Sequence, residues 1–421
     1  MHHFDLRDGV LHAEDVALPE LAAAVGTPAF VYSRATLTRH YQVMDAALQG
    51  VPHTICYAVK ANSNLAVLGL LASLGSGFDI VSGGELQRVL RAGGDPAKVV
   101  FSGVGKRDDE IAAALRARIL CLNIESAGEL ARVERVAAGL GLRAPISLRV
   151  NPEVDPRTHK YIATGLRSSK FGVAMADAAA LYRQAAASPH LRVLGIDSHI
   201  GSQIMDVAPM IEAVEKVLVL VDALRADGIV LEHLDIGGGL GIAYRDESPA
   251  APAELGKRMV ELALGAGLHL LAEPGRVIAG NAGLLVTRVL GQKTNGTKHF
   301  VIVDAAMNDN IRPALYDAWH AIRPVVPSLS AVERVVDVVG PVCESGDFLA
   351  LDRSLPELAD GDLLAVFGCG AYGFSMSSNY NSRPRAAEVM VDGAAWTVVR
   401  ERETVADLWR GERLLPERPG H

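Results

Sequence analysis

One complete unit of the expected fold lies in residues 54–81, which read TICYAVKANSNLAVLGLLASLGSGFDIV. The unit begins with a short apolar run, continues with apolar residues at helical spacing and ends in a second apolar run. Lys60 stands directly after the first run, where the chain leaves the apolar segment and turns. A strand, a helix and a second strand at this spacing are typical of a parallel β-sheet.

The same unit recurs as far as about residue 275. Eight apolar runs predict strands, at 54–59, 77–81, 99–103, 119–124, 146–150, 194–200, 231–236 and 268–273. Segments with helical spacing separate these runs, and several of them end in glycine, which the left-handed end of a helix prefers. Eight such units favour a (β/α)8 barrel over an open doubly wound sheet, although their order alone leaves closure of the barrel open.

The sequence changes character after residue 275. Short apolar runs joined by Gly and Asp turns, among them TNGT at 294–297, predict a region made mostly of strands. We therefore expect an α/β fold in which a (β/α)8 barrel domain spans 26–275. A second, β-rich domain would consist of 276–421 and of 1–25, which would add a strand to it.

Composition argues against several kinds of partner and setting. Forty-one Lys and Arg residues oppose 49 Asp and Glu residues, a net charge of -8 without a basic stripe, which argues against nucleic acid. Residues 1–20 contain no apolar segment of the signal-peptide kind, and no uncharged apolar run reaches the length of a membrane span. The four cysteines (Cys56, Cys121, Cys343, Cys369) form no CxxC pair, so we expect no metal site, no disulfide framework and a cytoplasmic location.

Polar or glycine residues stand at nearly every predicted strand end. In a (β/α)8 barrel these ends meet on one rim, where active sites are found. Each residue alone has a structural interpretation, such as a solvated lysine, a satisfied histidine, a glycine turn or an arginine paired with Asp79 or Glu85. The residues are Lys60, Asp79, Ser102, Asn123 with Glu125, Arg149, His199, Gly237 to Gly239 and Glu273.

Several members of this set meet the needs of one cofactor. Pyridoxal phosphate requires a lysine for a Schiff base, a partner for its ring nitrogen and backbone donors for its phosphate. Lys60 supplies the amine, and we expect the apolar run before it to lower its pKa. Gly237, Gly238 and Gly239 supply N–H groups for a phosphate cradle. Glu273 would keep the ring nitrogen protonated, which favours decarboxylation because a protonated ring is the stronger electron sink.

Eight motifs in order carry a family resemblance. They are YAVKAN, FDIVSGGE, HIGSQ, DIGGGLG, AEPGR, IRPALY, GPVCESGD and GAYGFSMSSNYN, between about residues 26 and 385. Together they resemble the diaminopimelate decarboxylases, in the alanine-racemase-like (fold type III) class of pyridoxal-phosphate enzymes. The resemblance implies decarboxylation of meso-2,6-diaminopimelate to L-lysine, the last step of lysine biosynthesis.

The resemblance also implies roles for cofactor-binding residues. Lys60 would form the Schiff base, His199 would stack on the ring, and Glu273 would pair with the ring nitrogen. Asp79, Glu85, Arg149 and Lys170 would take supporting positions around the cofactor, while Ser102 and Asn123 receive no role. The phosphate and its surroundings would be contacted by Ser202, Gly238, Gly239, Pro274, Gly275, Arg276 and Tyr372.

Further implied residues would recognise the substrate. Arg276 would grip one carboxylate, and Arg312 with Tyr316 would hold the distal carboxylate. Cys343 and Glu344 would reach into a partner subunit's site in a homodimer. There Cys343 would protonate the carbanion after CO2 leaves and Glu344 would bind the distal ammonium. Tyr372 is expected to come from the same partner chain.

Other functions remain as alternatives. One alternative is a related decarboxylase of ornithine, arginine or a carrier-bound amino acid. Those substrates have no second α-amino acid end, which the IRPALY and CESGD motifs together would recognise. An alanine racemase is expected to have an arginine where Glu273 stands. A non-catalytic pyridoxal-phosphate-binding barrel would not need the β-rich region. A barrel enzyme that uses Asp79 and Glu273 as acid and base leaves Lys60 and the glycine triplet unexplained.

Overall fold

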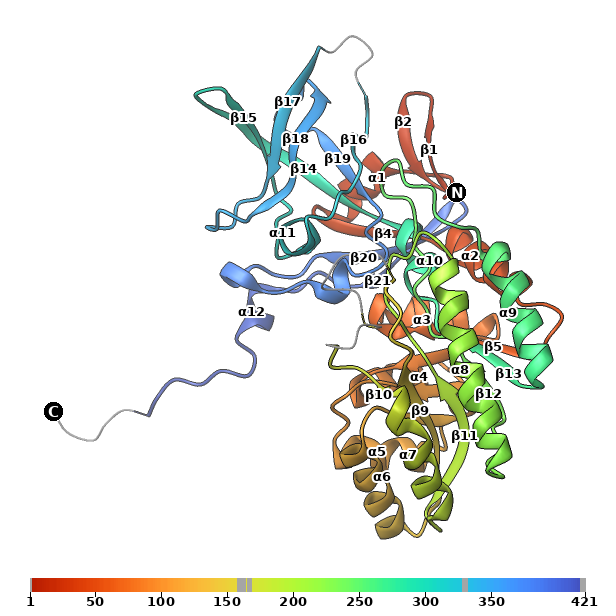
Figure 1. Ribbon diagram of the computed structural model, residues 1–421. Helices are drawn as coiled ribbons and strands as arrows, with labels where there is room; N and C mark the ends of the chain where they lie inside the picture. Colours follow the sequence, from red (N-terminus) through yellow and green to blue (C-terminus); the bar gives the residue numbers. More distant parts are fainter. Residues whose placement is uncertain (1, 157–163, 165–168, 328–331, 417–421) are drawn as a thin grey trace. The chain divides into compact units, whose positions relative to one another are not determined.

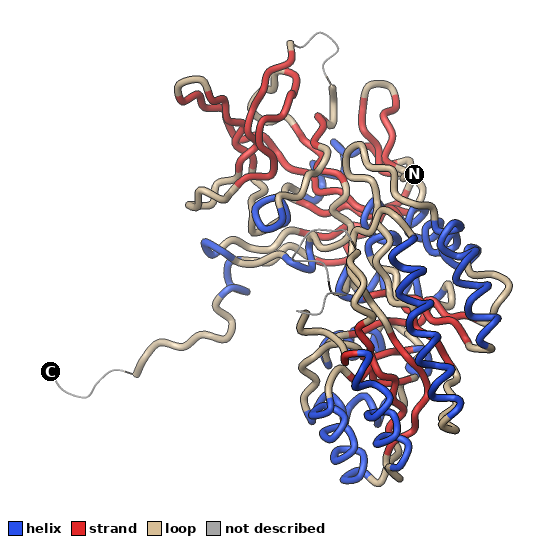
Figure 2. Tube along the Cα trace, in the orientation of Figure 1, coloured by secondary structure: helices blue, strands red, loops and turns tan. Residues whose placement is uncertain are grey.

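The chain folds into two compact units. The computed structural model in Figure 1 describes residues 2–156, 164, 169–327 and 332–416. One unit holds Ser33–Gly283 and Phe367–Ser375 with the first residues of the chain, and the other holds Phe4–Tyr32, Leu284–Val366 and the chain from Met376 onward. Helices predominate in the first unit and strands in the second (Figure 2).

The first unit is a closed parallel barrel. Its strand order within the described residues is β5, β6, β7, β8, β9, β11, β12, β13, and β13 pairs with β5 to close the ring. The predicted barrel is therefore confirmed, and each of its eight strands overlaps a predicted run. The strands are β5 His53–Ala58, β6 Gly77–Ile80, β7 Val99–Phe101, β8 Cys121–Ile124, β9 Ala144–Asn151, β11 Leu191–Asp197, β12 His233–Asp235 and β13 His269–Ala272.

Helices surround these strands (Figure 1). The helix α2 precedes the first barrel strand, was not predicted, and packs against α9. The short strand β10 (Val173–Ala174) extends the end of β9. The helices are α2 Arg34–Ala47, α3 Leu65–Ser73, α4 Gly83–Arg91, α5 Asp108–Ala117, α6 Ala127–Leu140, α7 Met175–Ala187, α8 Ala208–Ala226, α9 Pro252–Ala266 and α10 Arg276–Ala279.

Local sequence explains where these helices begin and end. The Asn64 side chain accepts a hydrogen bond from the Ala66 N–H and caps α3, so a helix begins five residues after Lys60. Ser126 caps α6 in the same way, and Gly141 ends it with φ of 65°, a left-handed conformation that suits glycine. These caps fix the loops that follow the barrel strands.

Apolar side chains fill the middle of the barrel. Cys56, Val100, Cys121, Leu194 and Leu271 form one buried cluster contributed by five different strands. Burial of a large aliphatic side chain stabilises a fold by about 1.5 to 3 kcal/mol. The cluster therefore stabilises the packing of the strands whose carboxyl ends carry the polar rim.

The second unit is built around a mixed sheet in which β15 and β17 are parallel and β14–β15, β17–β18 and β20–β21 are antiparallel pairs. The strand order is β18, β17, β15, β14, β4, β20, β21, and β19 pairs with both β14 and β16. The predicted TNGT turn joins β14 to β15. The strands are β4 Ala29–Ser33, β14 Gly283–Asn295, β15 Lys298–Val303, β16 Ile322–Pro324, β17 Glu333–Val339, β18 Phe348–Pro356, β19 Leu363–Phe367, β20 Ala387–Asp392 and β21 Ala395–Arg400, with the short helices α11 Arg312–Tyr316 and α12 Val405–Leu408.

The N-terminal residues contribute differently from the expectation. β1 (Phe4–Arg7), β2 (Val10–Ala13) and β3 (Val16–Ala17) form a small sheet of their own, followed by α1 (Leu18–Val25). The strand that joins the main sheet is β4, just beyond residue 25. Across the described residues, no helix has both the length and the apolar character needed to cross a bilayer.

Candidate functional site

The ends of the barrel strands bring the predicted residues to one rim. Because all eight strands are parallel and adjacent, their carboxyl ends face the same side of the barrel. Asp79, Asn123 and Arg149 lie within strands near this end, and the other predicted residues follow their strands by one to four positions. The contacts between them define the site.

Lys60 and Asp79 form an ion pair on this rim. Lys60 lies in the short 3-10 helix Val59–Ala61, and its Nζ donates to Asp79 Oδ2 at 2.7 Å. Burial lowers the pKa of Lys60, but the carboxylates of Asp79 and Glu273 raise that pKa by more, so it lies above the ordinary value. The expectation that apolar surroundings lower this pKa is wrong, because two carboxylates face the amine.

Glu273 is buried among other acids. Ser102 Oγ donates to Glu273 Oε1 at 3.4 Å, and Asn123 Nδ2 donates in turn to Ser102 Oγ at 3.1 Å. Burial and then the neighbouring carboxylates of Asp235, Asp79 and Asp197 raise the pKa of Glu273 well above its usual range. Ser102 and Asn123, which received no role from the sequence, therefore orient Glu273.

His199 is held as a neutral imidazole. Its Nδ1 accepts a hydrogen bond from the Gly238 N–H at 3.1 Å, which assigns the proton of the ring to Nε2. Burial, Arg149 and Lys60 lower the pKa of His199 well below 6.5. The ring is thus fixed against the glycine loop without a charge.

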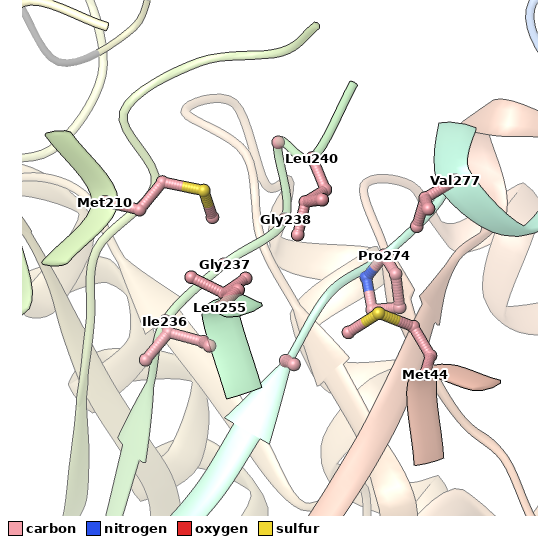
Figure 3. Close-up of a pocket in the computed structure, with 11 residues that line it drawn as sticks. Met44, Met210, Ile236, Gly237, Gly238, Leu240, Leu255, Pro274 and Val277 are labelled. Atoms are coloured by element: carbon pink, nitrogen blue, oxygen red, sulfur yellow. The ribbon is translucent and has the colours of Figure 1, made fainter. Parts of the chain in front are cut away.

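The glycine triplet after β12 has no room for side chains. A Cβ on Gly238 would stand 2.2 Å from the Glu273 carbonyl oxygen, and one on Gly239 would stand 2.6 Å from the Gly201 carbonyl oxygen. Gly237 and Gly239 have φ of 64° and 121°. The triplet also lines a small apolar pocket (Figure 3). Its other lining residues include Met44, Met210, Ile236, Leu255, Pro274 and Val277.

Two of the three glycine N–H groups already have acceptors. The Gly237 N–H donates to Asp235 Oδ1 at 2.9 Å, and the Gly238 N–H donates to His199. Among the described residues, no acceptor faces the N–H of Gly239. In this conformation the Gly239 N–H is therefore the group of the triplet that can donate to a further acceptor.

Arg276 lies at the edge of the same loop. Gly275 precedes it and packs closely, because a Cβ there would stand 3.0 Å from Ala61 Cβ. Arg276 Nη2 donates to Ser202 Oγ at 3.1 Å, and Nη1 donates to the Tyr244 hydroxyl at 2.6 Å. Its guanidinium also lies 4.8 Å from the centre of the Tyr372 ring.

Tyr372 belongs to the barrel unit of its own chain. Its N–H donates to the Ala61 carbonyl oxygen at 2.8 Å, next to Lys60. The expectation that Tyr372 reaches the rim from a partner chain is wrong, because the segment Phe367–Ser375 is part of this barrel unit. The motif GAYG therefore completes the rim in cis.

Gln203 joins the loop after β11 to the loop after β12. Its side-chain Nε2 donates to the Ile242 carbonyl oxygen at 2.7 Å, and its Oε1 accepts from the Ile242 N–H at 3.2 Å. Gln203 has φ of 58°, a strained conformation for a side chain of this size. The motif HIGSQ contributes to the family resemblance, but no role was predicted for its glutamine.

The supporting residues lie around the rim with partners of their own. Arg149 Nη1 pairs with Glu125 Oε1 at 3.3 Å and its Nε lies 3.9 Å from Asp197 Oδ2, so its partners differ from the anticipated Asp79 and Glu85. Burial raises the pKa of Glu85 to about 7, although its carboxylate accepts the Val81 N–H. Lys170 is exposed and lies 5.2 Å from the Phe171 ring centre.

The remaining predicted residues lie in the second unit. Arg312 is buried at the start of α11, where its Nη1 lies 3.3 Å from His320 Nε2, and Tyr316 ends the same helix. Cys343 and Glu344 are exposed on the loop between β17 and β18. The four cysteines of the chain are all free thiols.

Two buried acids were missed by the sequence analysis. Asp197 is the last residue of β11 and Asp235 is the last residue of β12, and both side chains lie inside the barrel beside Glu273. An aspartate within a predicted strand, as in LGID and LEHLD, is the signal that was available.

Comparison with known proteins gives this geometry a family context. Residues 34–280 match the family described as "Pyridoxal-dependent decarboxylase, pyridoxal binding domain". The diaminopimelate decarboxylase of Vibrio cholerae is 57% identical over 419 residues, 99% of this chain and 100% of that protein. That of Pseudomonas aeruginosa is 56% identical over 417 residues, again 99% and 100%. The crystal structure of diaminopimelate decarboxylase from Helicobacter pylori complexed with L-lysine is 45% identical, has a TM-score of 0.90, and covers 93% of this chain and 98% of that one.

Proposed function

The chain belongs to the diaminopimelate decarboxylases, within the pyridoxal-dependent decarboxylase family, and we propose that its rim removes CO2 from meso-2,6-diaminopimelate to form L-lysine. The observation that carries this proposal is the presence of a lysine, Lys60, and a buried glutamate, Glu273, on the same rim of the barrel. The related enzyme of Helicobacter pylori was crystallised with L-lysine, the expected product.

The residues present fit pyridoxal phosphate. A primary amine, a buried carboxylate, a neutral imidazole and a glycine loop without room for any Cβ are the groups that this cofactor needs. Lys60 would attach it, Glu273 would face its ring nitrogen, and Ser202 with the Gly239 N–H would face its phosphate. When bound, the cofactor supplies the electron sink that stabilises the negative charge left by departing CO2.

The protein groups then have separate tasks. Glu273 would hold a proton at the ring nitrogen, and Asp79 pairs with the amine of Lys60 and keeps it on the rim. The neutral His199 would pack against the ring without adding charge. Arg276 offers a planar guanidinium that can bind a carboxylate through two hydrogen bonds. We assign supporting roles to Glu85, Arg149 and Lys170.

We also propose that substrate selection requires residues of the second unit. Arg312 and Tyr316 would bind the distal carboxylate, Glu344 the distal ammonium, and Cys343 would return a proton to the carbon that loses CO2. A thiol is mostly protonated at neutral pH and can act as this acid. The exposure of Cys343 and Glu344 supports their contribution to a neighbouring subunit of a homodimer, in a cytoplasmic enzyme with free thiols.

A substrate panel tests the proposed reaction. The purified protein with added pyridoxal phosphate is assayed for CO2 release from meso-diaminopimelate, its LL isomer, ornithine, arginine and lysine. We expect turnover of meso-diaminopimelate and little of the others, and none by Lys60→Ala. Faster turnover of ornithine or arginine would support the related decarboxylases instead. Borohydride treatment and peptide mapping should locate the cofactor on Lys60.

Hybrid dimers test the shared site. Lys60→Ala and Cys343→Ala are each expected to be inactive, and mixing them after subunit exchange should restore up to about a quarter of the wild-type activity, since random exchange gives half hybrids with one intact site each. Lys60→Ala mixed with Tyr372→Ala should restore none, because two residues that act from the same chain leave one defect in each site of the hybrid. Absence of recovery with Cys343→Ala, despite demonstrated exchange, refutes the shared site.

A further inference from the structure

Asp235 links the glycine loop to the interior of the barrel. It is the last residue of β12 and is completely buried. Its Oδ1 accepts the Gly237 N–H at 2.9 Å, whereas its Oδ2 is buried without a hydrogen-bond partner among the described residues. An ionised carboxylate in this position would leave one oxygen desolvated and unsatisfied, which costs free energy.

Other acids crowd this unsatisfied oxygen. Carboxylate oxygens of Asp197, Asp235 and Glu273 lie within 4.8 Å of one another. Carboxylates this close in a buried site cannot all be ionised, because like charges repel strongly where water is excluded. At least one proton must therefore remain on the cluster.

The strands around Asp235 carry titratable or charged groups that affect its protonation. The titratable neighbours are Asp79 on β6, Arg149 on β9, Asp197 on β11 and Glu273 after β13, and the thiols of Cys56 on β5 and Cys121 on β8 interact with Asp235. Arg149 is the cation of this set, and its guanidinium is shared with Glu125. Lys60 is paired with Asp79. The two cations are thus already engaged by other carboxylates.

We propose that Asp235 holds a proton and donates it through Oδ2 to the Glu273 carboxylate, which makes Asp235 a positioning residue for the partner of the ring nitrogen. The assignment of Glu273 rests on the proposed function, whereas the shared proton is a property of the protein itself. Burial raises the pKa of Asp235 to about 7. The direction of that shift agrees with the geometry.

A neutral Asp235 satisfies both of its neighbours at once. One oxygen accepts the Gly237 N–H and the other donates to Glu273, so a single carboxyl fixes the glycine loop and the glutamate in register. With the cofactor bound, Glu273 would carry the negative charge that holds a proton at the ring nitrogen. Asparagine has the same pattern of one acceptor and one donor, whereas alanine has neither.

This pattern gives a test that does not depend on turnover. Infrared spectra of the protein before cofactor is added should contain the carbonyl band of a protonated carboxyl at pH 6, with the shift in D2O that marks an exchangeable proton. We expect the band to lose intensity in Asp235→Asn, because the substitution removes one protonated carboxyl of the cluster. A band of unchanged intensity in Asp235→Asn, or no such band in the wild type, overturns the proposal.

Cofactor affinity provides the second measurement. Titration with pyridoxal phosphate should show Asp235→Asn within about threefold of the wild type and Asp235→Ala weaker by about tenfold or more, as expected for lost buried hydrogen bonds. Asp222→Asn, on the exposed face of α8, is the matched control and should change neither measurement. Equal losses in Asp235→Asn and Asp235→Ala refute the neutral form. If no variant binds the cofactor, the proposed function fails, while the infrared result still decides the shared proton.

Discussion

Substitution of Gly238 tests how tightly the glycine loop is built. In Gly238→Ala the new Cβ would stand 2.2 Å from the Glu273 carbonyl oxygen and 3.0 Å from its carbonyl carbon. Ordinary contacts need about 3.5 Å, so the two backbones must separate by more than about 1 Å. That movement would break the hydrogen bond from the Glu273 N–H to the Gly237 carbonyl oxygen, at 2.8 Å, and the one from Gly238 to His199.

The cost follows from these contacts. Overpacking a well-packed interior costs about 1 to 3 kcal/mol, and each lost hydrogen bond adds about 1 kcal/mol. We expect the free energy of unfolding of Gly238→Ala to fall by about 3 to 5 kcal/mol, with loss of cofactor binding. Urea denaturation followed by circular dichroism, and absorbance titration with pyridoxal phosphate, measure the two effects.

A second glycine provides the control. Gly128 lies in α6 with nothing within 4 Å of an added Cβ, so Gly128→Ala should be neutral or stabilise the protein by about 0.5 to 1 kcal/mol. If Gly238→Ala has the same free energy of unfolding and the same cofactor affinity as the wild type, the close contact between Gly238 and the Glu273 backbone is not required for the site.

Three further predictions concern charge and loop geometry. Asp79→Asn removes a carboxylate that raises the pKa of Lys60, so the reaction of Lys60 with pyridoxal phosphate should shift to lower pH by about one to two units, and an unchanged pH profile contradicts this. Gln203→Met removes two hydrogen bonds and should weaken cofactor binding about tenfold, whereas Gln49→Met at an exposed position should not. Because burial raises the pKa of Asp235 from 3.8 to about 7, the folded protein binds a proton that the unfolded chain lacks, and stability should fall by up to about 4 kcal/mol as pH rises through this window. Asp235→Asn should flatten that dependence in urea denaturation at pH 5 and 8.

The sequence predicted the barrel because its signals are local. Each strand is a short apolar run, each helix has its own cap, and Ser126 with Gly141 fixes both ends of α6. The rim followed from strand direction alone, since parallel strands place Lys60 and Glu273 at the same end.

The parts that the sequence did not predict depend on contacts between distant strands. The pKa of Lys60 depends on Asp79 and Glu273, which lie 19 and 213 positions further along the chain. The use of the Gly237 and Gly238 N–H groups depends on Asp235 and His199, and no local pattern indicates which N–H groups are already taken. Only the three-dimensional arrangement shows that the rim rests on a layer of buried acids.

The loop that carries Cys343 and Glu344 combines a fixed backbone with exposed side chains. Asp347 accepts the N–H groups of Met307 and Val342, both at 2.7 Å, and the Cys343 N–H donates to Asn381 Oδ1 at 2.9 Å. Ordering a loop costs conformational entropy, and here the two side chains gain no burial within their own unit in return. A loop held in this way is pre-organised to present a thiol and a carboxylate to another surface, which favours a site completed by a second copy of the chain.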